Sequence, residues 1–356
     1  MTDTLARCVR LVGRAAALSL ALSLPAGAAS DLPEPPGFDT GRIPAAGDRP
    51  AIGYHLWYPA RPGGMATVVG RNAVFRGTPA RQGAPWPDGP FPLVVVSHGG
   101  GGNAGQMGWI AAALARRGYA VALPNHPGST TGDASPERVV QVWRRPPHVT
   151  ALIDALLNGP GPHPAIDPDR IAVLGFSAGG TTALSLVGAR IDPERLATFC
   201  DDGAPGLSDC AYLARGGVDL HALDLSAAVR NGTDPRLGAA VAVDPGLAPT
   251  LTADSLAQVA VPVLLVNLGE GDAVPAAVRA DLLAQSIPGA THATVPDADH
   301  FSFLGTCTEG GAAVLRAEGE PDALCRDGTG RPRAAIQAAL ADRIGAFLDA
   351  ALPPDE

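Results

Sequence analysis

The chain has 356 residues, enough to bury a large core as one large domain or two small ones. Its formal net charge of −9 leaves no basic surface, which argues against a nucleic-acid partner. All 26 basic residues are arginine, so a phosphate-loop lysine, a Schiff-base lysine and a Ser–Lys dyad are excluded.

The N-terminus has the pattern of a secretory signal peptide, which we place at residues 1–29. Three arginines precede an apolar run at 15–24, and the small residues at 26–28 form a candidate cleavage site. The run is too short to span a bilayer. We therefore predict a secreted or periplasmic protein without a stable membrane span; a short membrane anchor is the alternative interpretation.

The rest of the chain is expected to fold as an α/β protein. Residues 30–50 are rich in Pro, Gly and Asp and predict an extended lead-in without a core of its own. Strands and helices then alternate over 51–352, which predicts a single domain with a mostly parallel sheet covered by helices on both faces. Residues 52–58 and 66–75 are expected to open it as an antiparallel pair. Further strands are predicted at 93–97, 119–123, 171–174, 239–243, 261–268 and 291–295, and helices at 105–117, 149–157 and 333–352.

Two insertions interrupt this alternation, at about 199–238 and 301–332. Each is a candidate wall or lid of a pocket, and decorative surface loops are the alternative. Removal of the signal peptide leaves four cysteines, which allow three connectivities; proximity favours Cys200–Cys210 and Cys307–Cys325. No Cys-x-x-Cys or His-x-x-x-His spacing indicates a metal site.

The most informative segment is residues 171–180, Ile-Ala-Val-Leu-Gly-Phe-Ser-Ala-Gly-Gly. An apolar strand turns into a helix of small residues, with Ser177 at the turn between Gly175 and Gly179. These glycines are expected where strand and helix approach too closely for a Cβ atom. The Gly-x-Ser-x-Gly pattern in this strand–turn–helix context predicts a nucleophile elbow with Ser177 as nucleophile.

A serine hydroxyl needs a neighbouring base, which in turn needs an orienting carboxylate. In a sheet of this type the base is the last of the three in chain order. Three histidines follow Ser177: His221 lies in the first insertion and His292 begins a predicted strand. His300 follows that strand in a polar turn, so it is the preferred base.

Two aspartates compete for the role of acid because each follows a predicted strand at its carboxyl edge. Asp272 is favoured, and Asp244 is the alternative. Whichever does not act is expected to cap a helix or fix a loop. The weaker contenders are Glu270, Asp297 and Asp299.

Attack on a carbonyl also needs donors for the developing oxyanion, and backbone N–H groups supply them in a fixed orientation. One is expected from Ala178 at the start of the elbow helix. The other is expected from the glycine-rich loop 98–102, with Gly100 preferred and Gly101 next. His98 is expected to brace this loop rather than take part in catalysis.

These motifs resemble the α/β-hydrolase superfamily, and the likeness covers nearly everything from about residue 50 onward. Within it, the chain resembles secreted bacterial hydrolases of the dienelactone-hydrolase-like and platelet-activating-factor-acetylhydrolase-like group. The resemblance is carried by Leu-Trp-Tyr-Pro at 56–59, Val-Ser-His-Gly-Gly at 96–100, Asn-His-Pro-Gly-Ser at 125–129, Gly-Phe-Ser-Ala-Gly-Gly at 175–180 and Asp-His-Phe at 299–301.

The resemblance implies Ser177 as nucleophile, His300 as base, and Gly100 and Ala178 as oxyanion donors. It leaves the acid open. Acetylhydrolase-like members carry it after the earlier strand, as at Asp244, whereas polyester hydrolases and most other relatives carry it later, as at Asp272. True dienelactone hydrolases have cysteine at the elbow, where this chain has serine.

The predicted function is that of a secreted serine esterase for short or medium acyl esters, acting on a small-molecule, lipid or polyester substrate without metal or cofactor. An amidase or peptidase with the same triad is the alternative, followed by a non-catalytic binder of acyl ligands. An aromatic content of 4% argues against a long stacked sugar-binding groove. Candidate residues for a compact apolar pocket are Trp109, Trp143, Phe176 and Phe301.

Overall fold

The computed structural model describes residues 34–159, 165–201, 208–320, 322–327 and 330–354. The predicted signal peptide lies outside these residues. The strands are β1 (Gly37–Ile43), β2 (Ile52–Tyr58), β3 (Met65–Val69), β4 (Thr78–Gln82), β5 (Phe91–Ser97), β6 (Ala120–Pro124), β7 (Ile166–Phe176), β8 (Leu237–Val243), β9 (Val263–Leu268) and β10 (Thr291–Val295).

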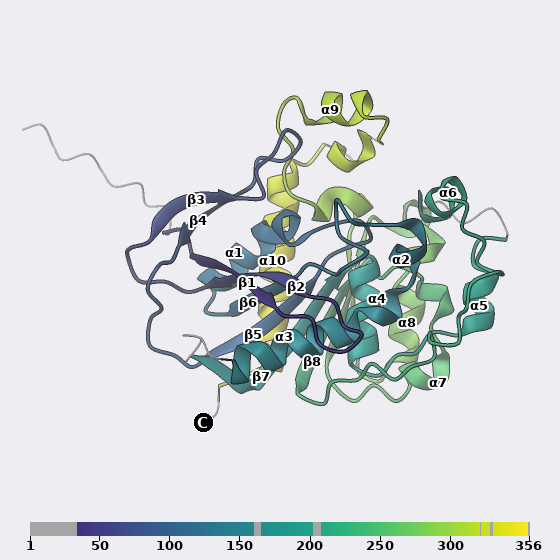
Figure 1. The fold of residues 1–356 in the computed structure, drawn as a ribbon, viewed down its shortest axis with the longest axis horizontal. Coiled ribbons are helices and arrows are strands. Elements are labelled where there is room, and N and C mark those ends of the chain that lie inside the picture. The colour runs from purple at the N-terminus through teal and green to yellow at the C-terminus, as the bar shows by residue number, and fades with distance from the viewer. Residues whose placement is uncertain (1–33, 160–164, 202–207, 321, 328–329, 355–356) are drawn as a thin grey trace, which may run out of the picture. The chain divides into compact units, whose positions relative to one another are not determined.

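Helices occupy most of the connections between these strands (Figure 1). The α-helices are α1 (Gly108–Arg116), α2 (Pro136–Val140), α3 (Pro146–Asn158), α4 (Ala178–Leu186), α5 (Pro193–Ala197), α6 (Ser208–Arg215), α7 (Ala253–Leu256), α8 (Asp281–Ser286), α9 (Gly311–Ala317) and α10 (Arg333–Ala351). The 3-10 turns are η1 (Ala104–Met107), η2 (Val142–Arg144), η3 (Ala248–Thr250), η4 (Gly271–Ala273), η5 (Ala276–Val278), η6 (His300–Phe303) and η7 (Asp322–Cys325).

All described strands belong to one ten-stranded sheet in the order β10-β9-β8-β7-β5-β6-β2-β1-β4-β3. The half from β10 to β6 is parallel throughout. Strand β2 then runs antiparallel to both β6 and β1. A mostly parallel sheet interleaved with helices confirms the predicted fold class.

The opening strands pair differently from the prediction. Strand β2 does not pair with β3: it pairs with β1 along its full length, and β3 instead forms a hairpin with β4. Strand β1 comes from the expected lead-in, and it is held in the sheet by Phe38 and Ile43, which are both buried. The abundance of Pro, Gly and Asp around it obscures this short apolar alternation in the sequence.

Helices cover both faces of the sheet, because its central strands are apolar on both sides. In β5, Leu93 and Val95 pack in the core that includes residues of α3 and α4, whereas Val94 and Val96 pack with α1 and α10. This burial on both faces holds the parallel strands in place, so their carboxyl ends lie at one edge of the sheet. The candidate site residues follow the strands at that edge.

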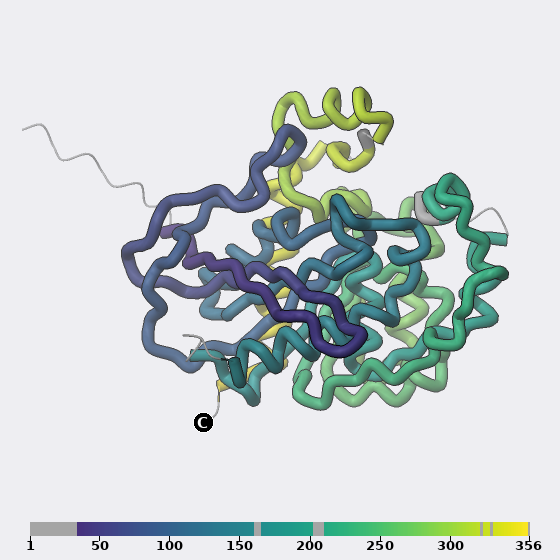
Figure 2. The backbone as a smooth tube through the Cα atoms, in the orientation of Figure 1, coloured from purple at the N-terminus to yellow at the C-terminus, as the bar shows by residue number. Residues whose placement is uncertain are grey.

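Each of the two insertions contains a disulfide. The first contains α6 and the Cys200–Cys210 bond, and the second contains α9, η7 and the Cys307–Cys325 bond. Both predicted pairings are confirmed. Figure 2 shows the two insertions apart from each other, with the yellow-green helix α9 beside the loop between β3 and β4, where Phe75 bridges to Cys307.

Candidate active site

Ser177 stands alone between the last residue of β7 and the first residue of α4. Its φ of 55° lies in a region that non-glycine residues rarely adopt. The strained backbone is held from two sides: the Ser177 N–H donates to Val243 O at 3.0 Å, and the Ser177 carbonyl accepts from Gly246 N at 2.9 Å. Ser177 therefore has the backbone geometry of a nucleophile elbow.

The glycines around Ser177 are required by close approach, as the sequence predicted. A Cβ atom on Gly175 would overlap the carbonyl of Gly179, and one on Gly179 would overlap the Ser97 carbonyl at the end of β5. A Cβ atom on Gly99 would lie 3.4 Å from Ser177 Cβ. The elbow is thus packed directly against the glycine-rich loop that follows β5.

The predicted base forms a hydrogen-bonded pair with the alternative acid. His300 Nδ1 and Asp244 Oδ2 are 2.9 Å apart, although the residues are 56 positions apart in the chain. The Asp244 side chain is fully buried, and that of His300 is 11% exposed. The ring of His300 lies 4.7 Å from the ring of Phe176, which is the residue before Ser177.

Within the described residues no hydrogen bond joins Ser177 to His300, and the second ring nitrogen of His300 has no partner. Bonds between a nucleophile and its base are often long in ligand-free structures and tighten when substrate binds. Nε2 of His300 is therefore free to form a hydrogen bond. The His300 ring lies against Phe176, the residue immediately before Ser177.

Asp244 is oriented by backbone geometry and by a second set of donors. Its φ is 42°, a conformation in which the chain turns sharply after β8. The oxygen that does not face His300 accepts from Asn267 Nδ2 and from Leu268 N, both at 2.9 Å. These donors belong to β9, so the neighbouring strand holds the carboxylate in place.

The geometry does not support the sequence preference for Asp272. Asp272 lies exposed in η4, and no hydrogen bond or ion pair connects it to His300 in the described part of the chain. Glu270 precedes the same turn, and Asp297 forms a 3.7 Å ion pair with Arg331. Asp299 caps η6 by bonding with Ser302, and burial followed by the charge of Asp327 raises its pKa.

The other two histidines after the elbow have different partners. His221 Nε2 lies 2.8 Å from Asp201 on the surface of the first insertion. His292 Nε2 lies 3.2 Å from the side-chain oxygen of Asn267, behind the acid. Asn267 is the residue that the sequence reasoning missed: one polar side chain inside the otherwise apolar run of β9 was the available signal.

Two backbone N–H groups expected to bind an oxyanion are free within the described residues. The N–H groups of Gly100 and Ala178 donate to no protein acceptor there. Ala178 opens α4, and the N-terminus of a helix favours negative charge. Gly100 adjoins the loop residue that packs on Ser177, and α2 covers it through Val139.

His98 braces the glycine-rich loop, as predicted. Its Nε2 accepts from His126 N at 3.2 Å, which leaves Nδ1 to donate to Gly99 O at 2.7 Å. Burial, followed by the charge of Arg145, lowers the pKa of His98 to about 3. His98 is therefore neutral at neutral pH, and this neutral ring supplies one donor and one acceptor.

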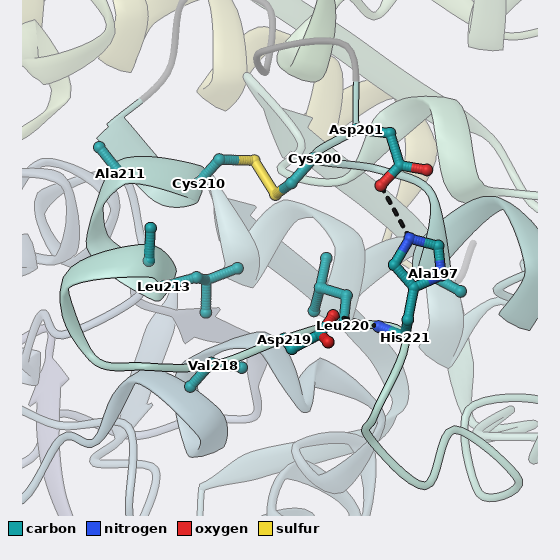
Figure 3. Close-up of a pocket in the computed structure, with 11 residues that line it drawn as sticks. Ala197, Cys200, Asp201, Cys210, Ala211, Leu213, Val218, Asp219, Leu220 and His221 are labelled. Carbon is teal, nitrogen blue, oxygen red and sulfur yellow. Dashed lines mark hydrogen bonds and ion pairs between the residues drawn. A yellow bond between two sulfur atoms is a disulfide. The ribbon is translucent and has the colours of Figure 1, made fainter.

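A cavity of about 530 Å³ is lined mostly by residues of the first insertion. Figure 3 shows the Cys200–Cys210 disulfide on one side of it and the facing His221 and Asp201 side chains on another. Neither Ser177 nor His300 lines this cavity.

Three of the four aromatic residues proposed for a pocket lie near the base. Phe176 and Phe301 both contact the His300 ring, and Trp109 packs against Phe303 in the same turn. Trp143 is buried in the opposite core.

Among the described residues, no cluster of three or more His, Cys, Asp or Glu side chains has the arrangement needed to hold a metal ion. None of the described helices combines the length and hydropathy that crossing a bilayer requires.

Comparison with known proteins agrees with this architecture. A family model described as the alpha/beta hydrolase fold matches residues 92–218, which include the glycine-rich loop and the elbow. The fold is similar to that of a ferulic acid esterase from Streptomyces cinnamoneus, with 20% identity, a TM-score of 0.57 and 92% of each chain covered. The chain has the α/β-hydrolase fold, so the resemblance to that superfamily is confirmed at the level of the fold.

Two further solved structures are similar over most of this chain. A putative dipeptidyl aminopeptidase IV from Bacteroides ovatus is 13% identical, with a TM-score of 0.49, over 90% of this chain and 37% of that one. A predicted CIB-like hydrolase from Thermoplasma acidophilum is 11% identical, with a TM-score of 0.44, over 87% and 99% of the two chains. No curated protein matches the chain in sequence.

Proposed function

We propose that this protein is a serine hydrolase that cleaves carboxylic esters with short to medium acyl groups. Ser177 is the nucleophile, His300 is the base and Asp244 is the acid. The observation that carries the proposal is the buried hydrogen bond of 2.9 Å between His300 and Asp244. The ring of the same His300 contacts Phe176, which directly precedes the strained Ser177.

The reaction proceeds in two halves. Ser177 Oγ attacks the ester carbonyl carbon while His300 Nε2 takes the hydroxyl proton, which gives a tetrahedral intermediate with a negatively charged oxygen. The C–O bond to the alcohol then breaks, and the alcohol leaves with the proton from His300. Water next attacks the acyl-enzyme through the same base, which releases the carboxylic acid and restores the Ser177 hydroxyl.

Each supporting group has a defined part in these steps. Asp244 accepts from Nδ1 of His300, so Nε2 is left to act as base and the imidazolium that forms is stabilised. The free N–H groups of Gly100 and Ala178 donate to the oxyanion, where fixed donors stabilise developing charge most.

Two lines of support favour an ester substrate. The ferulic acid esterase of similar fold acts on an ester, as its name states. An acid after the earlier strand, at Asp244, also matches the placement in acetylhydrolase-like members of the resembled group. The two disulfides are typical of proteins that fold in an oxidising compartment, in keeping with a secreted or periplasmic esterase whose signal peptide is residues 1–29.

The test is hydrolysis of nitrophenyl esters of increasing acyl length by the wild type, Ser177→Ala and Ser185→Ala. Ser185 is a buried serine at the far end of the same helix and serves as the control. We expect Ser177→Ala to lower kcat/KM by about 10³-fold or more, and Ser185→Ala to leave it within about threefold. Equal activity of Ser177→Ala and wild type would overturn the assignment.

The same experiment separates the other functional classes. A wild type inactive on every ester but active on peptide anilides in a Ser177-dependent manner would be an amidase or peptidase. A wild type that binds acyl ligands without turning over any substrate would be a binder, and the proposal would be wrong.

A further inference from the structure

We propose that Arg145 is a positioning residue of the oxyanion site, one that orients and polarises the peptide group whose N–H comes from Gly100. This inference rests on the proposed function, because it assigns a part in that reaction to a residue outside the triad. Arg145 touches no reacting atom. It acts through the backbone of the glycine-rich loop 98–102.

The contacts of Arg145 converge on this loop. Its Nη1 donates to His98 O at 2.6 Å, and its Nη2 donates to Gly99 O at 3.3 Å. Nη2 also donates to Ser129 Oγ at 2.5 Å, and the Ser129 carbonyl accepts from Gly101 N at 3.1 Å. One guanidinium thereby links two successive carbonyls of the loop to the segment that supports it from behind.

The second of these carbonyls belongs to the peptide group that matters most for the reaction. Gly99 O and the N–H of Gly100 are the two ends of one planar amide. Gly99 O accepts from Arg145 and from His98 Nδ1, while the N–H of Gly100 is free within the described residues. Donation to the carbonyl withdraws electron density from the amide, so its N–H becomes a stronger donor.

The charge of Arg145 is not balanced locally. The side chain is 2% exposed, and none of its hydrogen bonds or ion pairs in the described residues is to a carboxylate. Its Nε is buried there without a partner. Burial lowers the pKa of Arg145 to about 9, so the guanidinium remains charged at neutral pH.

The surroundings add to this surplus of positive charge. Burial lowers the pKa of the neighbouring His148, the charges of Arg145, Arg144 and Arg49 lower it further, and no acidic residue among those described acts in the opposite direction. Arg145 also occupies the N-cap of α3, where the helix dipole disfavours a cation. An unpaired buried cation at such a position destabilises the fold.

A site that destabilises the fold and lies beneath a reacting centre is a candidate for function. The unbalanced cation becomes favourable when a negative charge appears beside it. The oxyanion formed on attack by Ser177 is such a charge, and it is absent from the bound ester. Arg145 should therefore stabilise the transition state more than the ground state and raise kcat rather than lower KM.

The test compares Arg145→Met, Arg145→Lys and a control, Arg236→Met, by kcat and KM on a nitrophenyl ester. Arg236 forms several hydrogen bonds to Asp234 and Asp154 and directly precedes the opposite, N-terminal end of β8. A phosphonate that reacts with Ser177 counts the competent sites, so kcat is expressed per site. The affinity of a trifluoromethyl ketone, which forms an oxyanion on Ser177, is measured in parallel.

We expect Arg145→Met to lower kcat per site by about 10- to 100-fold with KM changed less than threefold, and to weaken ketone binding by a similar factor. Arg145→Lys should recover part of this loss because it keeps the charge. Arg236→Met should reduce thermal stability with kcat per site unchanged.

Two outcomes would overturn the inference. One is a kcat per site in Arg145→Met within threefold of wild type, which would show a purely structural role. The other is an equal loss in Arg236→Met. If Arg145→Met does not fold, the neutral variant Arg145→Gln decides instead, since kcat per site and ketone affinity within threefold of wild type there would refute the role. A wild type without Ser177-dependent activity would refute the proposed function instead.

Discussion

Asp244 is held by three hydrogen bonds, and their arrangement leads to a first prediction. Asp244→Asn removes the charge that faces His300 and changes which ring nitrogen carries the proton. We expect kcat to fall by about 10⁴-fold, whereas Asp272→Asn should change it less than threefold. Steady-state kinetics on a short nitrophenyl ester checks both variants. A large loss in Asp272→Asn with little loss in Asp244→Asn would reverse the assignment.

The identity of the acid could not be decided from the sequence, for a reason visible at the level of single residues. Asp244 and Asp272 both follow strands whose carboxyl ends meet at one edge of the sheet. What separates them is the conformation of Asp244 at φ 42° and the donors from Asn267 and Leu268. Neither the dihedral angle nor the donor set is a property of local sequence. The candidate nucleophile and base, by contrast, could be named from chain order and motif alone.

Gly179 supports a second prediction, on stability. Any side chain there would overlap the Ser97 carbonyl, which is backbone and cannot rotate away. We expect Gly179→Ala to lower the free energy of unfolding by about 1–3 kcal/mol or more. Gly310→Ala is the matched control, because a Cβ atom there meets nothing within 4 Å, and it should stay within about 0.5 kcal/mol. Urea denaturation measures both, and equal stabilities would contradict the close-approach argument.

At the scale of elements, the strands buried on both faces were predictable, as were β2 and the edge strand β10, whereas β1 and β4 were not. Strands β5, β7, β8 and β9 each contain a continuous apolar run, because each packs against helices on two sides. Strand β4 has only one buried residue among its five, so its sequence contains no apolar run. The predicted pairing of β2 with β3 was wrong, because the choice of partner for each strand depends on the arrangement of the whole sheet.

The two disulfides support a third prediction, because they differ in their distance from the base. Replacing Cys307 and Cys325 by serine removes a bond with a sequence separation of 18, and we expect a loss of about 3 kcal/mol in the free energy of unfolding. The bond restrains the segment that begins at His300, so kcat should also fall severalfold. Serine at Cys200 and Cys210 should lower stability but leave kcat unchanged. Denaturation and kinetics on both double variants test this contrast.

At the scale of the whole molecule, buried histidines predict how stability depends on pH. Burial, the largest cause for each, lowers the pKa of His98 to about 3, that of His148 to about 4, and that of His126 well below its usual value. The unfolded chain takes up these protons near pH 6.5, before the folded chain does. Stability is therefore full above pH 6.5 and falls as the pH drops toward 4, by up to about 1.4 kcal/mol per pH unit for each histidine.

Two variants test this fourth prediction through its sign. His148→Gln removes one group whose pKa is lowered by folding, so the loss of stability between pH 6.5 and 4 should become shallower. The pKa of His221 is instead raised by its bond to Asp201, so His221→Gln should not make that loss shallower. Urea denaturation at several pH values provides the slopes. An unchanged slope in His148→Gln would show that this histidine is not held neutral by the fold.

His300 and Asp244 form a pair but are 56 residues apart in the chain, so they are synthesised at different times. The elbow and the proposed acid have been synthesised once the chain extends just past β8, but the proposed base follows β10. If the proposed triad is the catalytic one, a nascent chain at that stage carries its nucleophile but lacks the base that activates it. By the proposed mechanism, reactivity appears only when the C-terminal part of the chain joins the sheet, so the order of synthesis itself keeps the unfinished protein inert toward esters in the compartment where it is made.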